Sequence, residues 1–236
     1  NAAQVNEQGY AGVQVNNPLN DTFMQQISQV DGVKEILPFE KLYCTFEYNG
    51  RRDNDFIVPF TEEEFTHLSK HIETQDRSYS DIVENKEIFV LKNDTVEEIY
   101  GWKFQPGDTI KFEWFDGTEY REDVFSIGGE ITSEKAYSDP ECFTALGVSG
   151  WFLMPDDLVY TMLPEGCNIN SEVLLSTEWD SKEEEITQQL NGIIANSNDL
   201  QMRTLRDSIN SKAGMYNTLL TSIIGISIFI MMFSLI

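Results

Sequence analysis

The chain has 236 residues, and its 16 Lys and Arg residues against 40 Asp and Glu residues give a formal net charge of −24. A surface this acidic repels phosphate backbones, which excludes nucleic-acid binding. The hydrophobic content of 41% and aromatic content of 12% exclude a disordered chain. An acidic surface suits a cationic partner such as a basic peptide, and it equally serves to keep a domain soluble.

The first part of the chain predicts a strand, a helix and a hairpin. Residues 9–15, GYAGVQV, are strand-like, and the start of the chain has no signal-peptide pattern. The segment NDTFMQQISQVDG predicts a helix that is capped by Asn20 or Asp21 and ends at Gly32. Two strand-like runs then meet at Asn49-Gly50, a dipeptide typical of a type I′ turn. The predicted apolar face of the helix consists of Phe23, Ile27 and Val30.

The middle of the chain reads as short helices and strands. A capping box at Thr61–Glu64 predicts a helix with Phe65, Leu68 and Ile72 inward. Residues 86–91 are a short buried strand, and Asn93 would cap a helix after it. The run 109–115 alternates polar and apolar residues and turns at Asp116-Gly117 into a second hairpin. Gly128-Gly129 predicts a bulge, and residues 133–147 are loop-like.

Further along, residues 151–155 predict a strand, 156–163 a short helix and 171–179 a strand. A second capping box at Ser181–Glu184 opens a helix that buries Ile186, Leu190, Ile193 and Ile194.

The C-terminal stretch from Ala213 to Ile236 carries no charge. At about 1.5 Å per residue it reaches about 36 Å, enough to cross a hydrocarbon core of about 30 Å. The alternative is a buried core helix. We expect the last helix to begin near Asn198 as a stalk and to cross the membrane at 213–236. Its predicted heptad seam, which chance register would also explain, is Met202, Leu205, Ile209, Tyr216, Leu219, Ile223 and Ile226.

The candidate chemistry is sparse. Glu63, His67 and His71 follow one another at four-residue spacing, but they do not form an HExxH motif, and a solvated helix face explains them. The acidic runs at 62–64, 156–157 and 183–185 lie at predicted helix N-termini, where they favour the helix dipole. No nucleophile, phosphate-loop or calcium-loop motif is present. We therefore expect neither an enzyme nor a bound cofactor or metal.

Three cysteines allow at most one disulfide. Cys44 falls on the apolar face of a strand, where it would be a small core residue. Cys142 and Cys167 both lie in loop-like sequence, and whether they pair stays open.

The order of these segments resembles the extracytoplasmic domain of ABC transporter permeases of the MacB/FtsX type. The resemblance rests on FMQQISQVDGVKEILPFEKL, on the run KEIFVLKNDTVEEIYGWKFQPGDTIKFEWFDGTEYREDVFSIGGEI with its turn at Gly107-Asp108, on WFLMPDDLVYTM and on SEVLLSTEWDSKEEEITQQLNGII. It covers about residues 9–236.

The resemblance implies an α+β fold: a porter-like α/β subdomain of residues 1–60 and 165–197 and an inserted β-rich subdomain of 61–164. A stalk helix (198–212) and a transmembrane helix (213–236) would follow, as part of a longer permease. The domain would lie on the extracytoplasmic face of the cell membrane and couple ATP hydrolysis by a separate cytoplasmic subunit to export or mechanical work. The implied partners are that ATPase, a second permease copy, and a cationic peptide or envelope protein. The alternative is a membrane-anchored sensor or a regulator of cell-wall enzymes.

Overall fold

The computed structural model describes residues 17–72, 77–92, 97–98, 100–132, 151–177, 179–195, 197, 200–202 and 204. The described chain mixes helices with strands, as expected. The chain forms two compact units, residues 1–193 and 194–236. All helices and strands named in this section belong to the first unit, except that the last residue of α8, Ile194, belongs to the second.

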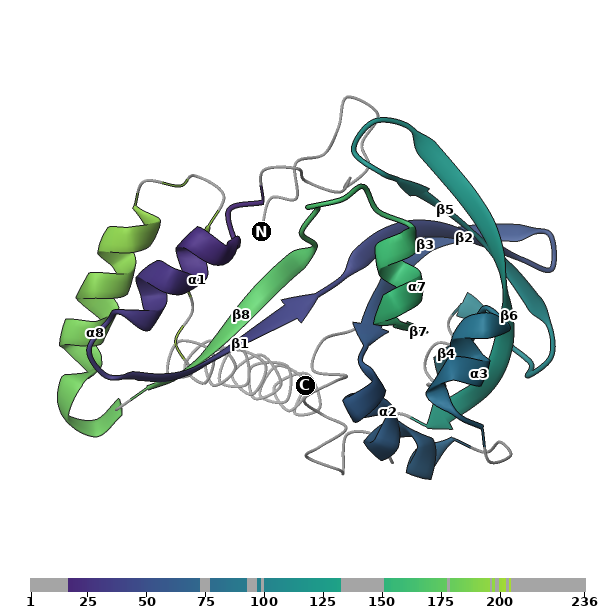
Figure 1. Cartoon of the computed structure of the whole chain (residues 1–236), viewed down its shortest axis with the longest axis horizontal. Coiled ribbons are helices and arrows are strands. Elements are labelled where there is room, and N and C mark those ends of the chain that lie inside the picture. The colour runs from purple at the N-terminus through teal and green to yellow at the C-terminus, as the bar shows by residue number, and fades with distance from the viewer. Residues whose placement is uncertain are drawn as a thin grey trace, which may run out of the picture. The chain divides into compact units, whose positions relative to one another are not determined.

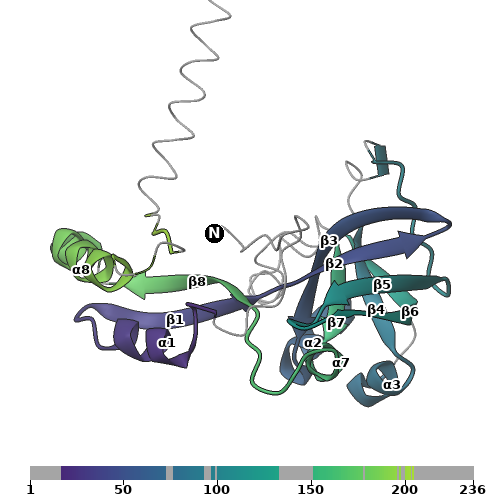
Figure 2. The same cartoon turned by 90° about the horizontal axis from the view of Figure 1, so that it is seen from above.

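The first and last described strands meet in a two-stranded antiparallel sheet, which we call the ribbon. Strand β1 (Val33–Glu40) pairs with β8 (Asn170–Thr177), and the two run side by side in Figures 1 and 2. Helix α1 (Asp21–Ser28) precedes β1, and α8 (Trp179–Ile194) follows β8. The Asn20 side chain caps α1 by accepting a hydrogen bond from the Phe23 amide, as predicted. Ile27 and Val30 are buried, and Gly32 lies in the turn into β1 with φ of 95°.

Strands between the two halves of the ribbon close into a barrel, in the order β2-β3-β7-β4-β6-β5. The β3–β7 and β4–β6 pairs are parallel, and the other neighbours are antiparallel. The barrel strands are β2 (Leu42–Tyr48), β3 (Arg51–Phe60), β4 (Glu87–Lys92), β5 (Thr109–Phe115), β6 (Tyr120–Thr132) and β7 (Phe152–Pro155).

Aromatic side chains fill the barrel. Phe46, Phe112 and Phe152 are fully buried, and their rings meet edge to face at centroid distances of 4.9–5.0 Å. Helix α7 (Asp156–Thr161) contributes Leu158 and Val159 to the same cluster. The predicted alternation in β5 is confirmed, because Ile110, Phe112 and Trp114 are all buried.

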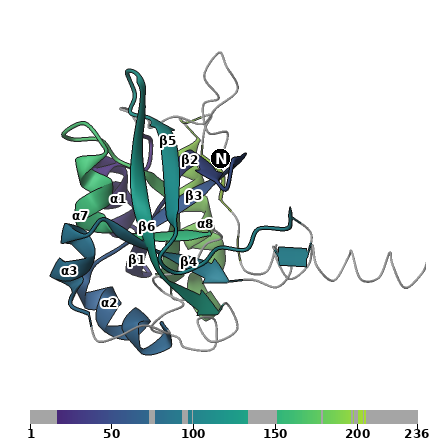
Figure 3. The same ribbon diagram turned by 90° about the vertical axis from the view of Figure 1, so that its right-hand side faces the viewer.

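A second apolar cluster lies between the barrel and two further helices. Helices α2 (Glu62–Leu68) and α3 (Tyr79–Glu84) lie against one side of the barrel in Figure 3, with the short helix η1 (Ser69–His71) after α2. The capping box of α2 is present, and the predicted inward residues Phe65, Leu68 and Ile72 are buried. These helices therefore shield the outer face of β3 and β4, where Phe60 and Phe89 lie.

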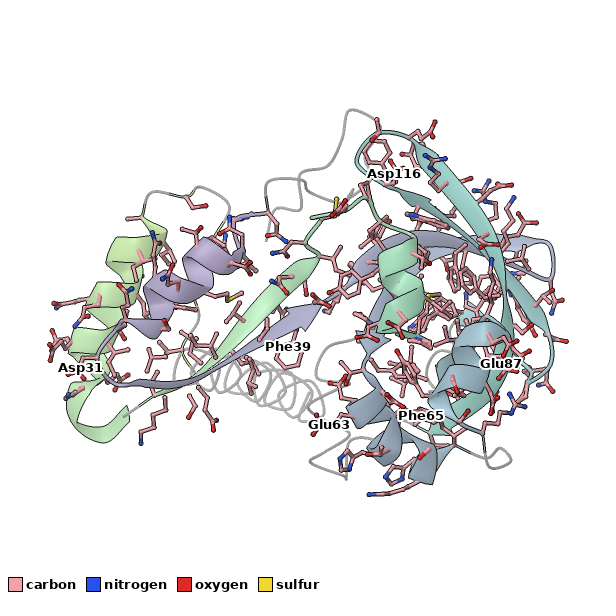
Figure 4. The ribbon with its side chains drawn as sticks, viewed as in Figure 1. Asp31, Phe39, Glu63, Phe65, Glu87 and Asp116 are labelled. Atoms are coloured by element: carbon pink, nitrogen blue, oxygen red, sulfur yellow. The ribbon has the colours of Figure 1, made fainter. Side chains whose placement is uncertain are left out.

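The local turns follow the predictions. Asn49 and Gly50 have φ of 51° and 73°, as a type I′ hairpin turn requires, and Tyr48 pairs with Arg51 across it. Asp116 organises the β5–β6 turn by accepting hydrogen bonds from the Thr118 and Glu119 amides and from Arg121 (Figure 4). The register of β4 against β6 skips Gly128, which confirms the bulge.

Three boundaries differ from the sequence predictions. The sequence placed residues 42–60 with the first subdomain, but β2 and β3 belong to the barrel, and the chain passes from ribbon to barrel at Lys41. Helix α8 begins at Trp179, two residues before the expected cap at Ser181. Leu200, Gln201, Met202 and Thr204 are not helical, so the expected start of the last helix near Asn198 is wrong.

Several predictions fall outside the described residues: the strand at 9–15, the cap at Asn93, the loop at 133–147 and the membrane segment at 213–236. Of the helix expected after Asn93, residues 97, 98 and 100 are described, and they are helical. Within the described ranges, no helix has both the length and the apolar character needed to cross a membrane.

Candidate functional site

A cleft of about 430 Å³ lies where the ribbon joins the barrel. Its walls come from the chain before and at the start of α1, from the last residue of β1 and from the loop that leads into β8. The lining residues are Asn17, Asn20, Asp21, Glu40, Gly166, Cys167, Asn168 and Asn170. We call this the junction cleft.

A network of asparagine amides builds one wall of the junction cleft. Asn17 donates from Nδ2 to the Asn170 carbonyl at 2.8 Å and to the Asn168 carbonyl and Oδ1 at 3.2 Å each. Asn168 and Asn170 both donate from Nδ2 to the Leu19 carbonyl, at 3.0 and 2.8 Å. Each of these three amide nitrogens therefore has at least one acceptor within the protein.

The acceptors of the same wall are not all used. Asn17 Oδ1 accepts from the Leu19 amide at 2.9 Å, and Asn168 Oδ1 accepts from the Asn170 amide at 2.8 Å. Asn170 Oδ1 is buried and has no partner among the described residues. A buried acceptor without a donor costs about 1–3 kcal/mol.

Glu40 supplies a half-buried carboxylate to the junction cleft. It lies directly opposite Asn170 in the ribbon, so both side chains share one face of the sheet. Tyr160 donates from its hydroxyl to Glu40 Oε1 at 2.6 Å, and Oε2 has no partner among the described residues. Burial raises the pKa of Glu40, and the negative charges of Asp156 and Glu64 raise it further. The hydrogen bond from Tyr160 lowers this pKa but does not cancel the rise.

None of the described residues that line the junction cleft has a basic side chain. Asp21, the second carboxylate of the lining, makes no hydrogen bond or ion pair with a described residue. The ion pairs found among the described residues lie elsewhere: Arg52–Glu113, Arg77–Glu87, Lys86–Asp123, Lys111–Glu122, Arg121–Asp116, Arg121–Glu119 and Lys182–Asp31. The cleft therefore holds negative charge that the described chain does not neutralise.

Cys167 lines the junction cleft as a free, partly exposed thiol. Burial raises its pKa, and the negative charge of Asp116 raises it further, so the thiol is a weak nucleophile. Its possible partner Cys142 lies outside the described residues. Cys44 is 1% exposed in the barrel core, as predicted.

The predicted coupling seam is not part of the junction cleft. Met202 is half-buried in a non-helical segment, and the remaining seam residues lie outside the described part of the chain: Leu205, Ile209, Tyr216, Leu219, Ile223 and Ile226. The stripe of Glu63, His67 and His71 does not run down one helix, because α2 ends at Leu68 and His71 belongs to η1. Figure 4 shows Glu63 on α2.

Sequence reasoning did not find the junction cleft. The sequence features that belong to it are two pairs of asparagines, at 16–17 and at 168 and 170. Asparagine is common in turns, so these pairs did not stand out as a site. Asn17 and Asn170 are 153 residues apart, and only the closure of the ribbon brings them together.

Comparison with known proteins gives structural neighbours only. No family model and no curated protein matches the chain. The extracellular domain of the noncanonic ABC-type transporter YknZ from Gram-positive bacteria is similar at 15% identity and a TM-score of 0.37, over 78% of this chain and 88% of that one. The periplasmic region of MacB from Actinobacillus actinomycetemcomitans is similar at 12% identity and a TM-score of 0.37, over 74% and 73%. The first of these is an extracellular domain and the second is a periplasmic region.

Proposed function

We propose that this chain is the extracytoplasmic domain of a MacB/FtsX-type ABC transporter permease. In this proposal it has no catalytic activity of its own and couples ATP hydrolysis by a cytoplasmic partner to mechanical work or export outside the membrane. The order of the sequence segments supports the assignment to this class. The observation that carries the coupling role is the pairing of β1 with β8.

The ribbon connects the C-terminal side of the described chain to the barrel. Strand β8 leads into α8, after which the chain continues to the uncharged stretch 213–236. Strand β1, hydrogen-bonded to β8 along its length, passes through Lys41 into barrel strand β2. A force that pulls on α8 is therefore shared by the β1–β8 hydrogen bonds and reaches the barrel through β2.

Further contacts stiffen this path. The Lys41 amide donates to the Ile169 carbonyl at 3.1 Å, which joins the two strands where they leave the ribbon. At the other end, Lys182 of α8 pairs with Asp31 in the turn before β1 at 2.6 Å. Figure 4 shows Asp31 in this turn, next to α8.

Location and partner can be tested on the full-length permease in cells. Cys142 and Cys167 are changed to Ser, and a reporter thiol is placed at the exposed Glu47 by Glu47→Cys. We expect a membrane-impermeant maleimide to label intact cells and an ABC ATPase to co-purify. Labelling only after permeabilisation would contradict the proposal. Labelling outside without an associated ATPase would instead support the anchored sensor or cell-wall regulator.

The coupling role has a matched pair of variants in β8. Leu175 is half-buried on one face of the ribbon, and Leu174 is 50% exposed on the other. We expect Leu175→Asp to loosen the ribbon and to abolish the response of ATPase activity to the permease in membranes. Leu174→Asp should leave that response intact. If both variant proteins fold and their ATPase responses are equal, transmission through the ribbon is refuted.

A further inference from the structure

We propose that the passage between ribbon and barrel is a hinge, and that the hydrogen bond from Tyr160 to Glu40 is the latch that holds it. The hinge consists of Lys41, between β1 and β2, and of Ile169, just before β8. It goes beyond the proposed function, which requires only that force passes along the ribbon. Three features of the junction support it: separate apolar cores, a narrow two-stranded crossing and a polar contact surface.

The ribbon and the barrel have separate apolar cores. The main barrel cluster reaches the junction at Leu42 on the outgoing chain and at Ile169 on the returning chain. Among the described residues, neither barrel cluster includes a residue of β1, β8, α1 or α8. The buried apolar residues on the ribbon side are Leu19, Ile27, Val30, Phe39, Ile186 and Leu190. Two bodies with separate cores move relative to each other unless a large apolar interface joins them.

Within the described ranges, the chain crosses between these two bodies twice, as an antiparallel pair. Glu40 lies opposite Asn170 at the end of the ribbon, and the Lys41 amide donates to the Ile169 carbonyl at 3.1 Å. A two-stranded ribbon shares tension among its hydrogen bonds, but it twists and bends more readily than a wider sheet, because no third strand braces it. The crossing is therefore stiff along the strands and compliant across them.

The side-chain contacts across the junction are polar, and the junction cleft lies beside them. Asn168, on the barrel side, donates to the Leu19 carbonyl at 3.0 Å and accepts from Asn17 at 3.2 Å. Hydrogen bonds of this kind exchange for hydrogen bonds to water at a small net cost. The cleft volume of about 430 Å³ leaves space for the start of α1 and the loop before β8 to approach each other or separate.

The contact between Tyr160 and Glu40 differs from these bonds because its acceptor is a carboxylate. It is also shorter, at 2.6 Å, and a charge-assisted hydrogen bond is about twice as strong as a neutral one. Tyr160 belongs to α7, which is anchored in the barrel core by Leu158 and Val159. Glu40 is the last residue of β1 and moves with the ribbon. The bond must therefore break before the ribbon swings away from α7.

The test measures the distance between two spin labels in the full chain in detergent micelles, by double electron–electron resonance. One label is attached at Glu35→Cys, exposed on β1, and the other at Glu47→Cys, exposed on β2. Cys142 and Cys167 are changed to Ser. Cys44 is kept, because at 1% exposure it does not react with the label.

We expect one narrow distance distribution with the latch intact. Tyr160→Phe should raise the population of other ribbon–barrel distances about fivefold, as for the loss of one hydrogen bond to a charged acceptor. Glu40→Gln keeps an oxygen that accepts from the Tyr160 hydroxyl, so it should cause a smaller change. Tyr100→Phe should cause none, because the Tyr100 hydroxyl makes no hydrogen bond to a described residue.

A second pair of labels separates hinge motion from loosening of the barrel. Glu84→Cys, exposed on α3, is combined with Glu47→Cys, and this distance within the barrel should be the same in all variants. An unchanged ribbon–barrel distance in Tyr160→Phe, an equal change in Tyr100→Phe, or a change within the barrel would each overturn the proposal. The measurement requires neither an ATPase nor transport, so its failure would leave the proposed function standing.

Discussion

The Tyr160 hydroxyl donates a 2.6 Å hydrogen bond to Glu40 and thereby joins α7, at the barrel, to the last residue of the ribbon strand β1. The two residues are 120 positions apart in the chain. Together with the Lys41–Ile169 hydrogen bond, this contact holds the place where the chain crosses from ribbon to barrel. It also orients the carboxylate at the edge of the junction cleft.

Removing this hydrogen bond should weaken the junction. We expect Tyr160→Phe to lower the free energy of unfolding by about 1 kcal/mol, since the bond has a charged acceptor but the tyrosine is 44% exposed. Urea unfolding followed by circular dichroism measures the change. Tyr100→Phe is the control, because Tyr100 is similarly exposed at 50% and its hydroxyl makes no hydrogen bond to a described residue. A loss of equal size in both variants would contradict the structural role of the Tyr160 hydroxyl.

Asp55 should make the protein less stable as the pH rises toward neutral. Burial raises its pKa from 3.8 to about 6, although the carboxylate accepts hydrogen bonds from the Phe56 and Trp151 amides. Because the folded pKa lies above the unfolded one, the folded state binds more protons between about pH 4 and pH 6. The free energy of unfolding therefore falls as the pH rises through this window, by up to about 3 kcal/mol.

The variant Asp55→Asn cannot ionise and should remove this part of the pH slope. Thermal unfolding at a series of pH values measures the slope. The slope is a better readout than the stability at one pH, because the Asn side chain has one acceptor oxygen fewer than Asp and this loss changes the stability at every pH. Glu47→Gln, at an exposed position on the neighbouring strand β2, should keep the wild-type slope. If Asp55→Asn retained it as well, the burial of Asp55 would not be its source.

Gly128 should tolerate no larger residue in the β6 bulge. A Cβ there would lie 2.8 Å from Glu87 Oε2, 3.2 Å from Glu87 Cβ and 3.3 Å from the Phe89 ring. Glu87 is held by Arg77 and Phe89 is buried, so neither neighbour yields freely. We expect Gly128→Ala to destabilise the domain by about 1–3 kcal/mol in urea unfolding.

Gly192 is the matched control for this substitution. It lies on an exposed face of α8, and an added Cβ would meet nothing within 4 Å. Gly192→Ala should therefore stabilise the domain by about 0.5–1 kcal/mol through helix propensity. A neutral or stabilising Gly128→Ala would show that the bulge is more open than the structure indicates.

Local structure was largely predictable from the residues because its causes lie within a few positions of each other. Asn49-Gly50 adopts positive φ at both residues, Thr61 and Glu64 satisfy each other's backbone amides, and Gly128 forms the bulge. The boundary between β1 and β2 was missed because no glycine or proline marks it. Lys41 lies between two strands that pair with different partners, and its amide bonds to Ile169, far along the chain.

The sequence by itself determined the acidic charge, the short helices and hairpins, the uncharged C-terminal stretch and the resemblance to a class of permeases. Only the tertiary structure decided that β2 and β3 belong to the barrel, that β1 pairs with β8, and that Glu40 faces Asn170 across a cleft. The physical reason is that caps and turns are settled by neighbouring residues, whereas strand pairing and long-range hydrogen bonding depend on groups that meet only after the chain has closed on itself.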